Sequence, residues 1–426
     1  MALDRDKYNT YLKILEEELL PALGCTEPIA IAYAGAKARE HLERFPDRII
    51  VKCSGNIIKN TKSVIVPNTG YLKGIEASVL MGVVAGDASK GMEVLEGATK
   101  EDIGRVKDLL DQEICQVQML KGVGNLHIIV ELIAGDDRLV VELVDSHTNI
   151  KRVEKNGVSL FSKEGEGERT PGDLADRSLL NVRDIFEFAN TLALEDVDQL
   201  LKMQVEYNLR IAEEGLKKNY GVNIGKMLLE CYGDNILTKV RAYAAAGSDA
   251  RMDGCGLPVV TNSGSGNQGI ATSLPVIIYA QEKGIDREKM YRALVLANLI
   301  TIHQKTGIGR LSAYCGAVSA ACGSGTGITY LEGGSLDQIE KTIVNTLANV
   351  AGIVCDGAKA SCAAKIASSL DAAIMAHFLA MKDTAFEEDS GIVKGTVENT
   401  ISAVSRLGRE GMKETDIEVL KIMLDE

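Results

Sequence analysis

The chain has 426 residues, 46% hydrophobic and 25% charged, which is an ordinary composition for a soluble globular protein. This length suggests two domains or one large lobed unit, and it can bury a core without disulfides. The formal net charge of −13 argues against a nucleic-acid surface, because phosphate binding needs clustered Lys and Arg. We find no uninterrupted apolar run of the ~18 residues that a membrane helix needs, and the charged N-terminus lacks a signal-peptide core. We therefore expect a cytoplasmic protein that binds neither nucleic acid nor membrane.

The first 170 residues predict a lobe of mixed helices and strands. Residues 8–43 have a helical pattern that breaks at 23–28, and residues 48–66 are rich in β-branched side chains. Further helices are expected at 75–92 and 100–118. Strands are expected at 126–133 and 139–144, joined by a hairpin loop. This first lobe is therefore predicted to be α+β.

The polar, Gly-rich segment 163–172 is the best candidate for a linker. The chain after it predicts mainly helices, at 178–194, 196–218, 287–303, 336–354, 363–381, 396–407 and 414–424. The expected fold class is thus α+β, with a mixed α/β lobe at residues 1–170 followed by a mainly helical lobe at 171–426.

The chain has nine cysteines, which is an odd number, and a cytoplasmic compartment is reducing. We therefore do not expect a full disulfide framework. Four of them have no partner at an informative spacing and are interpreted as small buried hydrophobic residues: Cys53, Cys115, Cys231 and Cys255.

Two pairs of cysteines, Cys315 with Cys322 and Cys355 with Cys362, are each seven residues apart. Seven residues are nearly two helical turns, so each pair could share one helix face. The small residues between them leave room for a bulky group beside the backbone. Iron–sulfur clusters bind cysteine thiolates, whereas structural zinc sites prefer closer pairs. The spacing by itself leaves metal binding and core packing equally open.

Cys25 precedes a predicted helix start, with Thr26 as the N-cap, Glu27 and Pro28 in the first turn, and the helix continuing through residues 30–45. A thiol at a helix N-terminus loses its proton more easily, because it faces the positive end of the helix dipole. Such a thiolate can act as a base, a nucleophile or a ligand. The alternative is a small residue at a tight turn.

Residues 261–269 form a Gly-, Ser- and Asn-rich segment between an apolar run and a helical one. Successive backbone amides in such a turn make an anion nest, which would suit a carboxylate as well as a phosphate. A flexible surface turn is the competing interpretation. His303, which precedes Cys315, could line a site or be structural.

Five blocks of the sequence resemble the L-cysteine desulfidases (the CyuA family). They occupy residues 22–28, 54–60, 66–70, 262–269 and 355–359, in the same order and over nearly the whole chain. The C-terminal half is also similar to the catalytic chain of bacterial iron–sulfur L-serine dehydratases, which carry a Cys-Asp motif followed by another cysteine.

The resemblance implies a 4Fe-4S cluster held by Cys315, Cys355 and Cys362, with one iron left open and Cys322 left out. It implies Cys25 as the acceptor of the α-proton of L-cysteine, which is converted to pyruvate, ammonia and hydrogen sulfide. The substrate carboxylate is expected at the Gly-rich segment, on Asn262, Ser263, Ser265, Gly266, Asn267 and Gln268.

Two other functions remain open from the sequence. The first is an L-serine dehydratase, in which hydroxide is the leaving group, and the second is a non-catalytic cysteine-binding or redox-sensing protein. A pyridoxal phosphate lyase is less favoured because it would use a Schiff-base lysine. The sequence does not fix the oligomeric state, for which a homodimer is one option.

Overall fold

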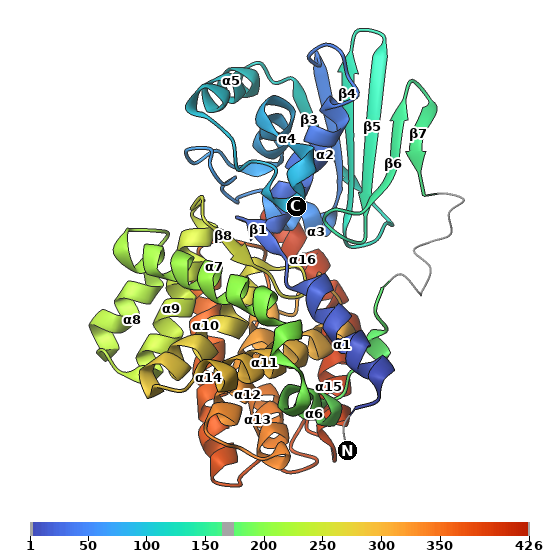
Figure 1. Ribbon diagram of the computed structural model, residues 1–426. Coiled ribbons are helices and arrows are strands. Elements are labelled where there is room, and N and C mark those ends of the chain that lie inside the picture. Colours follow the sequence, from blue (N-terminus) through green and yellow to red (C-terminus); the bar gives the residue numbers. More distant parts are fainter. Residues whose placement is uncertain (1–2, 164–173, 425–426) are drawn as a thin grey trace.

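The computed structural model describes residues 3–163 and 174–424. Figure 1 shows a lobe built on a sheet and a larger lobe of helices, so the predicted α+β class is confirmed. The predicted linker lies outside the described residues from position 164 on.

The sheet lobe contains a six-stranded sheet in the order β3-β2-β4-β5-β6-β7, with β3 parallel to β2 and each other pair antiparallel. Helices α2 and α4 pack against each other and against the sheet, and bury its apolar face. The bounds are β2 Arg48–Ser54, β3 Cys115–Leu120, β4 His127–Ala134, β5 Asp137–Val144, β6 Ile150–Lys155 and β7 Val158–Ser162, with α2 Thr26–Arg39, α3 Gly55–Thr61, α4 Gly74–Ala85 and α5 Lys100–Asp111.

Several predicted boundaries in this lobe are wrong. The helix expected at 100–118 ends at Asp111, because Glu113 has a positive φ of 53° and the following residues pair with β2 as strand β3. The stretch 48–66, rich in β-branched residues, forms a strand only as far as Ser54, and α3 follows directly. Strands β6 and β7 were not predicted. For β3 the deciding partner is β2, which is distant in sequence and absent from the local pattern, whereas β6 and β7 pair with neighbouring strands.

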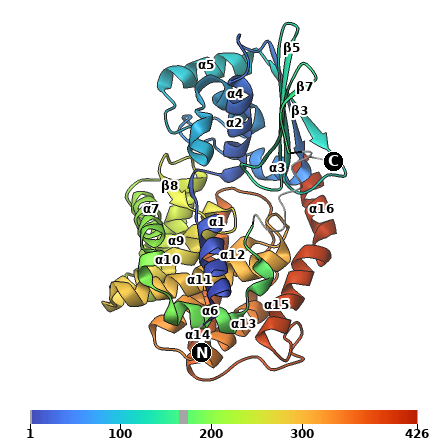
Figure 2. The same ribbon diagram turned by 45° about the vertical axis from the view of Figure 1, so that its right-hand side comes forward.

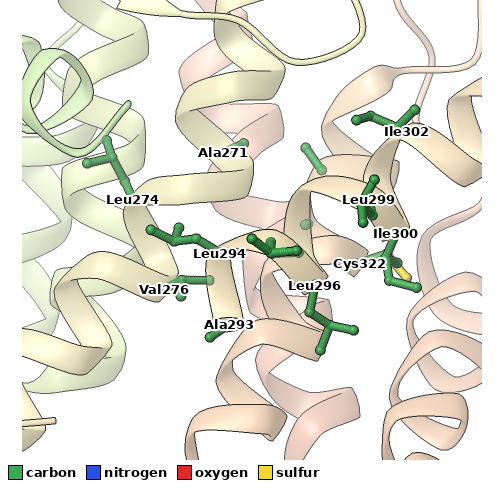
Figure 3. Close-up of a cluster of buried hydrophobic side chains, with 14 of the residues drawn as sticks. Ala271, Leu274, Val276, Ala293, Leu294, Leu296, Leu299, Ile300, Ile302 and Cys322 are labelled. Carbon is green, nitrogen blue, oxygen red and sulfur yellow. The ribbon is translucent and has the colours of Figure 1, made fainter. Parts of the chain in front are cut away.

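The larger lobe is a bundle of helices around one core. Its helices are α1 Arg5–Glu18, α6 Val182–Thr191, α7 Asp198–Lys217, α8 Ile224–Tyr232, α9 Ile236–Met252, α10 Gly266–Lys283, α11 Arg287–Ile308, α12 Gly316–Leu331, α13 Leu336–Val350, α14 Ser361–Met381 and α15 Val397–Arg406. Small residues let α11 and α12 approach closely: a Cβ on Gly323 would lie 2.1 Å from the hydroxyl oxygen of Thr301. Figure 3 shows part of this core, with side chains of α10, α11 and α12 in contact.

One helix in the described residues, α14, is long and apolar enough to cross a membrane by length and composition. Half of its most apolar window is buried, and it packs against α9, α12 and α13. A core helix of a soluble protein passes the same test.

The two lobes are joined by more than one crossing of the chain. Helix α1 contributes Tyr11, Ile14 and Leu15 to the core of the helical lobe, although it precedes the sheet. Strand β1 (Pro21–Leu23) then pairs antiparallel with β8 (Pro258–Val260). At the other end of the chain, α16 (Lys413–Leu424) returns to pack on α3, as Figure 2 shows. These crossings bring segments of both lobes to one pocket.

Candidate active site

The pocket is lined by residues of both lobes and has about 830 Å³ of space free of atoms, including its open mouth. Its sheet-lobe wall includes Cys25, Glu27, Asn60 and His147. Its helical wall includes Arg251, Ser263, Ser265, Asn267, Gln268, Lys305, Arg310, Cys315, Cys355 and Cys362. The cysteine predicted as base and the three predicted as cluster ligands therefore face the same space.

Cys25 is buried, with 1% of its surface exposed, and it is itself the N-cap of α2 in place of the predicted Thr26. Its Sγ donates a hydrogen bond to Oε2 of Glu27 over 3.1 Å. Burial and the negative charge of Glu27 raise the pKa of Cys25 well above its usual range, and the positive charge of Arg251 offsets only part of that rise. The expectation of an acidified thiol is therefore wrong, because desolvation and a neighbouring anion outweigh the helix dipole.

The carboxylate of Glu27 is held by three donors. Asn60 Nδ2 donates to its Oε1 over 3.0 Å, and the Thr26 hydroxyl and the Cys25 thiol donate to its Oε2. Nε2 of His147 lies 4.0 Å from Oε1, beyond hydrogen-bond distance. Burial opposes ionisation, yet the nearby His147 and the thiol of Cys25 lower the pKa of Glu27 to about 2. Glu27 is thus a buried anion that fixes the position of the thiol.

Cys315 and Cys355 are placed by a short antiparallel bridge between residues 314 and 354. The backbone N–H of Cys315 donates to the carbonyl of Ile353 (3.0 Å), and that of Cys355 donates to the carbonyl of Ala313 (2.7 Å). The thiol of Cys315 donates to the sulfur of Cys355. This bond raises the pKa of Cys315 and, with the charge of Lys59 and despite burial, lowers the pKa of Cys355 to about 6.

Cys362 lies in the first turn of α14, where its sulfur accepts from the backbone N–H of Lys359 over 3.5 Å. Cys355 lies in the loop before that helix, so the prediction that this pair shares a helix face is wrong. Cys322 is fully buried in α12 beside Ile300 (Figure 3) and does not line the pocket. Apart from Cys25, the cysteines that line the pocket are the three that the resemblance implied as ligands.

The Gly-rich segment is a tight turn that leads into α10. Asn262 and Ser265 exchange backbone hydrogen bonds of 3.1 Å, and positive φ angles of 51° at Ser263 and 77° at Gly264 give the turn its left-handed form. Of the six residues predicted to bind substrate, Ser263, Ser265, Asn267 and Gln268 line the pocket. Asn262 instead holds the turn by donating to Oδ1 of Asn298 over 3.0 Å.

Six buried polar atoms of pocket-lining residues have no hydrogen-bond partner among the described residues. They are Asn60 Oδ1, His147 Nε2, Arg251 Nε, Asn267 Oδ1, Gln268 Oε1 and Tyr314 Oη. Buried polar atoms are nearly always hydrogen-bonded in folded proteins. Their concentration in one place indicates a polar ligand.

The chemistry of the thiols fits an iron–sulfur cluster rather than a single metal ion. No three His, Cys, Asp or Glu side chains in the described ranges converge on one ion position. A cluster does not require such convergence, because each thiolate binds a different iron. Lys305, buried at the pocket so that its pKa falls to about 8, and Lys365, paired with Asp356, supply positive charge beside these thiols. The residues present therefore fit a negatively charged cluster.

Several residues that line the pocket were not predicted as site residues. Glu27 and Asn60 stand inside blocks that carried the family resemblance, so a signal for them was present. Arg251, Lys305 and His147 lie in ordinary helical or loop sequence and had none. His303 does not line the pocket: its Nε2 bonds Oε2 of Glu398 at 2.7 Å.

The four dispersed cysteines are not all buried, as the sequence analysis expected. Cys53 and Cys255 are buried, Cys115 is half-buried, and Cys231 is exposed on α8.

Fold and pocket together define an α+β protein with a site for a polar ligand that is walled by a buried thiol and three further cysteines. The family profile described as serine dehydratase alpha chain matches residues 89–421, and the chain belongs to this family. The family is associated with iron–sulfur serine dehydratases, and the match points to a lyase of the serine dehydratase type.

Two relatives match over their whole length. A protein of Lachnoclostridium phytofermentans named UPF0597 protein is 54% identical over 98% of this chain and 100% of its own. A UPF0597 protein of Treponema denticola is 50% identical over 100% of both chains. These relatives extend the similarity to the first 88 residues, which include Cys25 and Glu27 and lie outside the family match.

Proposed function

We propose that this protein is a cytoplasmic L-cysteine desulfidase, which converts L-cysteine and water to pyruvate, ammonia and hydrogen sulfide. The observation that supports it most is that Cys25 from one lobe and Cys315, Cys355 and Cys362 from the other line a single pocket. The resemblance assigns the base to the first and the cluster to the other three.

The turn before α10 receives the substrate. The side chains of Ser263, Ser265, Asn267 and Gln268 offer hydroxyl and amide groups to the polar end of an amino acid. Two of these amide oxygens have no partner in the described residues. Hydrogen-bond donors of the bound substrate can satisfy them.

Cys25 removes the α-proton in its thiolate form. Its raised pKa reduces the fraction of thiolate at neutral pH, but it also makes each thiolate a stronger base for a carbon acid. In the resting thiol form the hydrogen bond to Glu27 holds the sulfur in position, and burial excludes water that would compete for the proton. After the transfer the proton stays on Sγ.

Cys315, Cys355 and Cys362 would hold the cluster. When bound, a 4Fe-4S cluster with one iron not ligated by the protein supplies a Lewis acid for the departing sulfur. Loss of the α-proton and cleavage of the Cβ–S bond leave aminoacrylate, which tautomerises to an imine and is hydrolysed to pyruvate and ammonia.

The second candidate is L-serine dehydratase, which the family description favours. It would use the same thiol base and the same cysteines, with hydroxide leaving in place of sulfide. The two candidates therefore differ only in the leaving group that the pocket accepts.

The test is to purify the full chain without oxygen, reconstitute it with iron and sulfide, and measure sulfide and pyruvate from L-cysteine beside pyruvate from L-serine. Equal amounts of sulfide and pyruvate from L-cysteine, lost in air, are expected. Preference for L-serine would instead indicate that the protein is an L-serine dehydratase. A loaded cluster without turnover of either amino acid would contradict both and favour a binding or sensing protein.

A further inference from the structure

Arg251 is a buried cation without a carboxylate partner among the described residues. It lies at the end of α9, is 3% exposed and lines the pocket. Within the described ranges no carboxylate is in ion-pair distance of it, and its Nε has no hydrogen-bond partner. A buried guanidinium without an anion is strongly disfavoured. We therefore expect the guanidinium group of Arg251 to bind an anion.

The other cations on the pocket wall are already balanced. Arg310 pairs with Glu18 at 2.9 Å. Lys305 lines the pocket beside Cys355 and Cys315, the proposed cluster ligands. Among the pocket-lining cations of the described residues, this leaves Arg251 for an exogenous anion.

Gly266 keeps the guanidinium in its place. A Cβ on this residue would lie 2.4 Å from Nε and 2.7 Å from Cζ of Arg251. The backbone of Gly266 is not in the left-handed region, so the close approach of Arg251 and of Val259, and not the turn, requires glycine here. Gly266 does not line the pocket, and its expected role in substrate binding is exerted through Arg251.

Arg251 is also close to the reacting groups. Arg251 lines the pocket together with Cys25 and Cys362. Glu27, the one carboxylate among the described lining residues, accepts a hydrogen bond from the Cys25 thiol. A cation and an anion on the pocket that holds this thiol match the two charged groups of an α-amino acid.

We propose that Arg251 binds the α-carboxylate of the substrate amino acid, that Gly266 positions its guanidinium, and that the pair selects α-amino acids over amines. This rests on the proposed function only in taking an amino acid as the ligand. With the carboxylate on Arg251 and the ammonium group toward Glu27, the Cα–H bond is presented to Cys25.

The experiment is calorimetric titration of the reconstituted full chain with L-alanine, which has no leaving group, and with ethylamine, which lacks the carboxylate. Wild type is expected to bind L-alanine at least ~30-fold more tightly than ethylamine, the size expected of a charge-assisted pair. Arg251→Gln should remove that difference, and Arg251→Lys should restore part of it. Arg241→Gln is the matched control, because Arg241 lies on the same helix but pairs with Asp371.

Kinetics give a second, independent measurement. Arg251→Gln and Gly266→Ala should raise KM for L-cysteine ~10- to 100-fold. If either variant melts below the control, wild type alone still tests the proposal: L-cysteine methyl ester should lose a similar factor in kcat/KM.

The outcomes separate the two claims. Equal binding of L-alanine by Arg251→Gln and the control, or no binding of L-alanine by wild type, would overturn the role of Arg251. Binding of L-alanine that depends on Arg251, without turnover of L-cysteine or L-serine, would refute the proposed function and leave the role of Arg251 standing.

Discussion

The two walls of the pocket use the same residue type in opposite ways. On the sheet-lobe wall, burial and the anion Glu27 raise the pKa of Cys25. On the helical wall, a hydrogen bond from Cys315 and the charge of Lys59 lower the pKa of Cys355 to about 6. A thiolate of high pKa is a strong base for a carbon-bound proton, and a thiol that ionises readily suits metal ligation. The comparison of Cys25 with Cys355 teaches that the surrounding charges, and not the residue type, set the ionisation of a buried thiol. The pKa values of Cys315 and Cys362 are raised, so on the helical wall only Cys355 is shifted toward the thiolate.

The largest effect on turnover is expected from removing a proposed cluster ligand on the helical wall. Cys355→Ala should abolish iron binding and, with it, turnover, because a cluster held by three thiolates loses one of its ligands. Iron content and visible absorbance after anaerobic reconstitution measure this. Cys322→Ala is the matched control, since Cys322 is buried in the core and does not line the pocket. Iron loss in the control instead would make Cys322 a ligand.

Replacing Cys25 on the sheet-lobe wall should reduce turnover without reducing iron content. Cys25→Ser should retain the cluster absorbance and reduce turnover by about 10²- to 10⁴-fold, the usual contribution of a general base. Iron content and kcat are measured on the same sample. Loss of iron together with activity would indicate that Cys25 is a cluster ligand and would contradict its role as base.

A smaller effect sharpens the comparison, because it changes the charge beside Cys25 without removing the thiol. The negative charge of Glu27 favours the protonated form of Cys25, so Glu27→Gln should lower the pKa of that thiol. Activity that requires the thiolate should then appear at a pH about one unit lower, a typical effect of one nearby charge. Glu27 itself has a pKa of about 2 and does not titrate in the assay range.

The pH profile of kcat/KM checks this. Glu154→Gln serves as control, since Glu154 pairs with Arg152 on β6 and does not line the pocket. A profile for Glu27→Gln that coincides with the control would show that Cys25 does not limit the rate through its ionisation.

The sequence predicted the residues of this site better than their surroundings. Cys25, Cys315, Cys355 and Cys362 were chosen from motifs, and each faces the pocket. The direction of the pKa shift at Cys25 was wrong, because burial and the contact with Glu27 depend on the packing of both lobes.

For Arg251 the sequence carried no signal, because α9 was not among the predicted helices and a single arginine outside any motif looks like an ordinary surface residue. Helices with strong local periodicity, such as α7 and α13, were predicted closely. Strand β3 was not, since its identity comes from pairing with β2, more than fifty residues earlier.

The smallest expected effect on turnover concerns what holds the two walls together. Asp416 of the returning helix α16 bonds Lys59 and Asn56 of α3, and the side chain of Lys59 is only 2% exposed. Asp416→Asn leaves a buried ammonium group without its anion, which should cost about 1–3 kcal/mol of unfolding free energy. Turnover should change little, because Asp416 does not line the active-site pocket.

Chemical denaturation of the variant against Glu418→Gln measures the effect, since Glu418 on the same helix pairs with Lys421 in an exposed position. Equal stability of the two variants would mean that the contact of Asp416 with α3 does not stabilise the fold. A clear loss in Asp416→Asn alone would show that the last helix of the chain secures α3 between the pocket's two walls. The carbonyl of Lys59 packs against Gly357 in the loop that carries Cys355, so α3 connects the base side of the pocket to its ligand side.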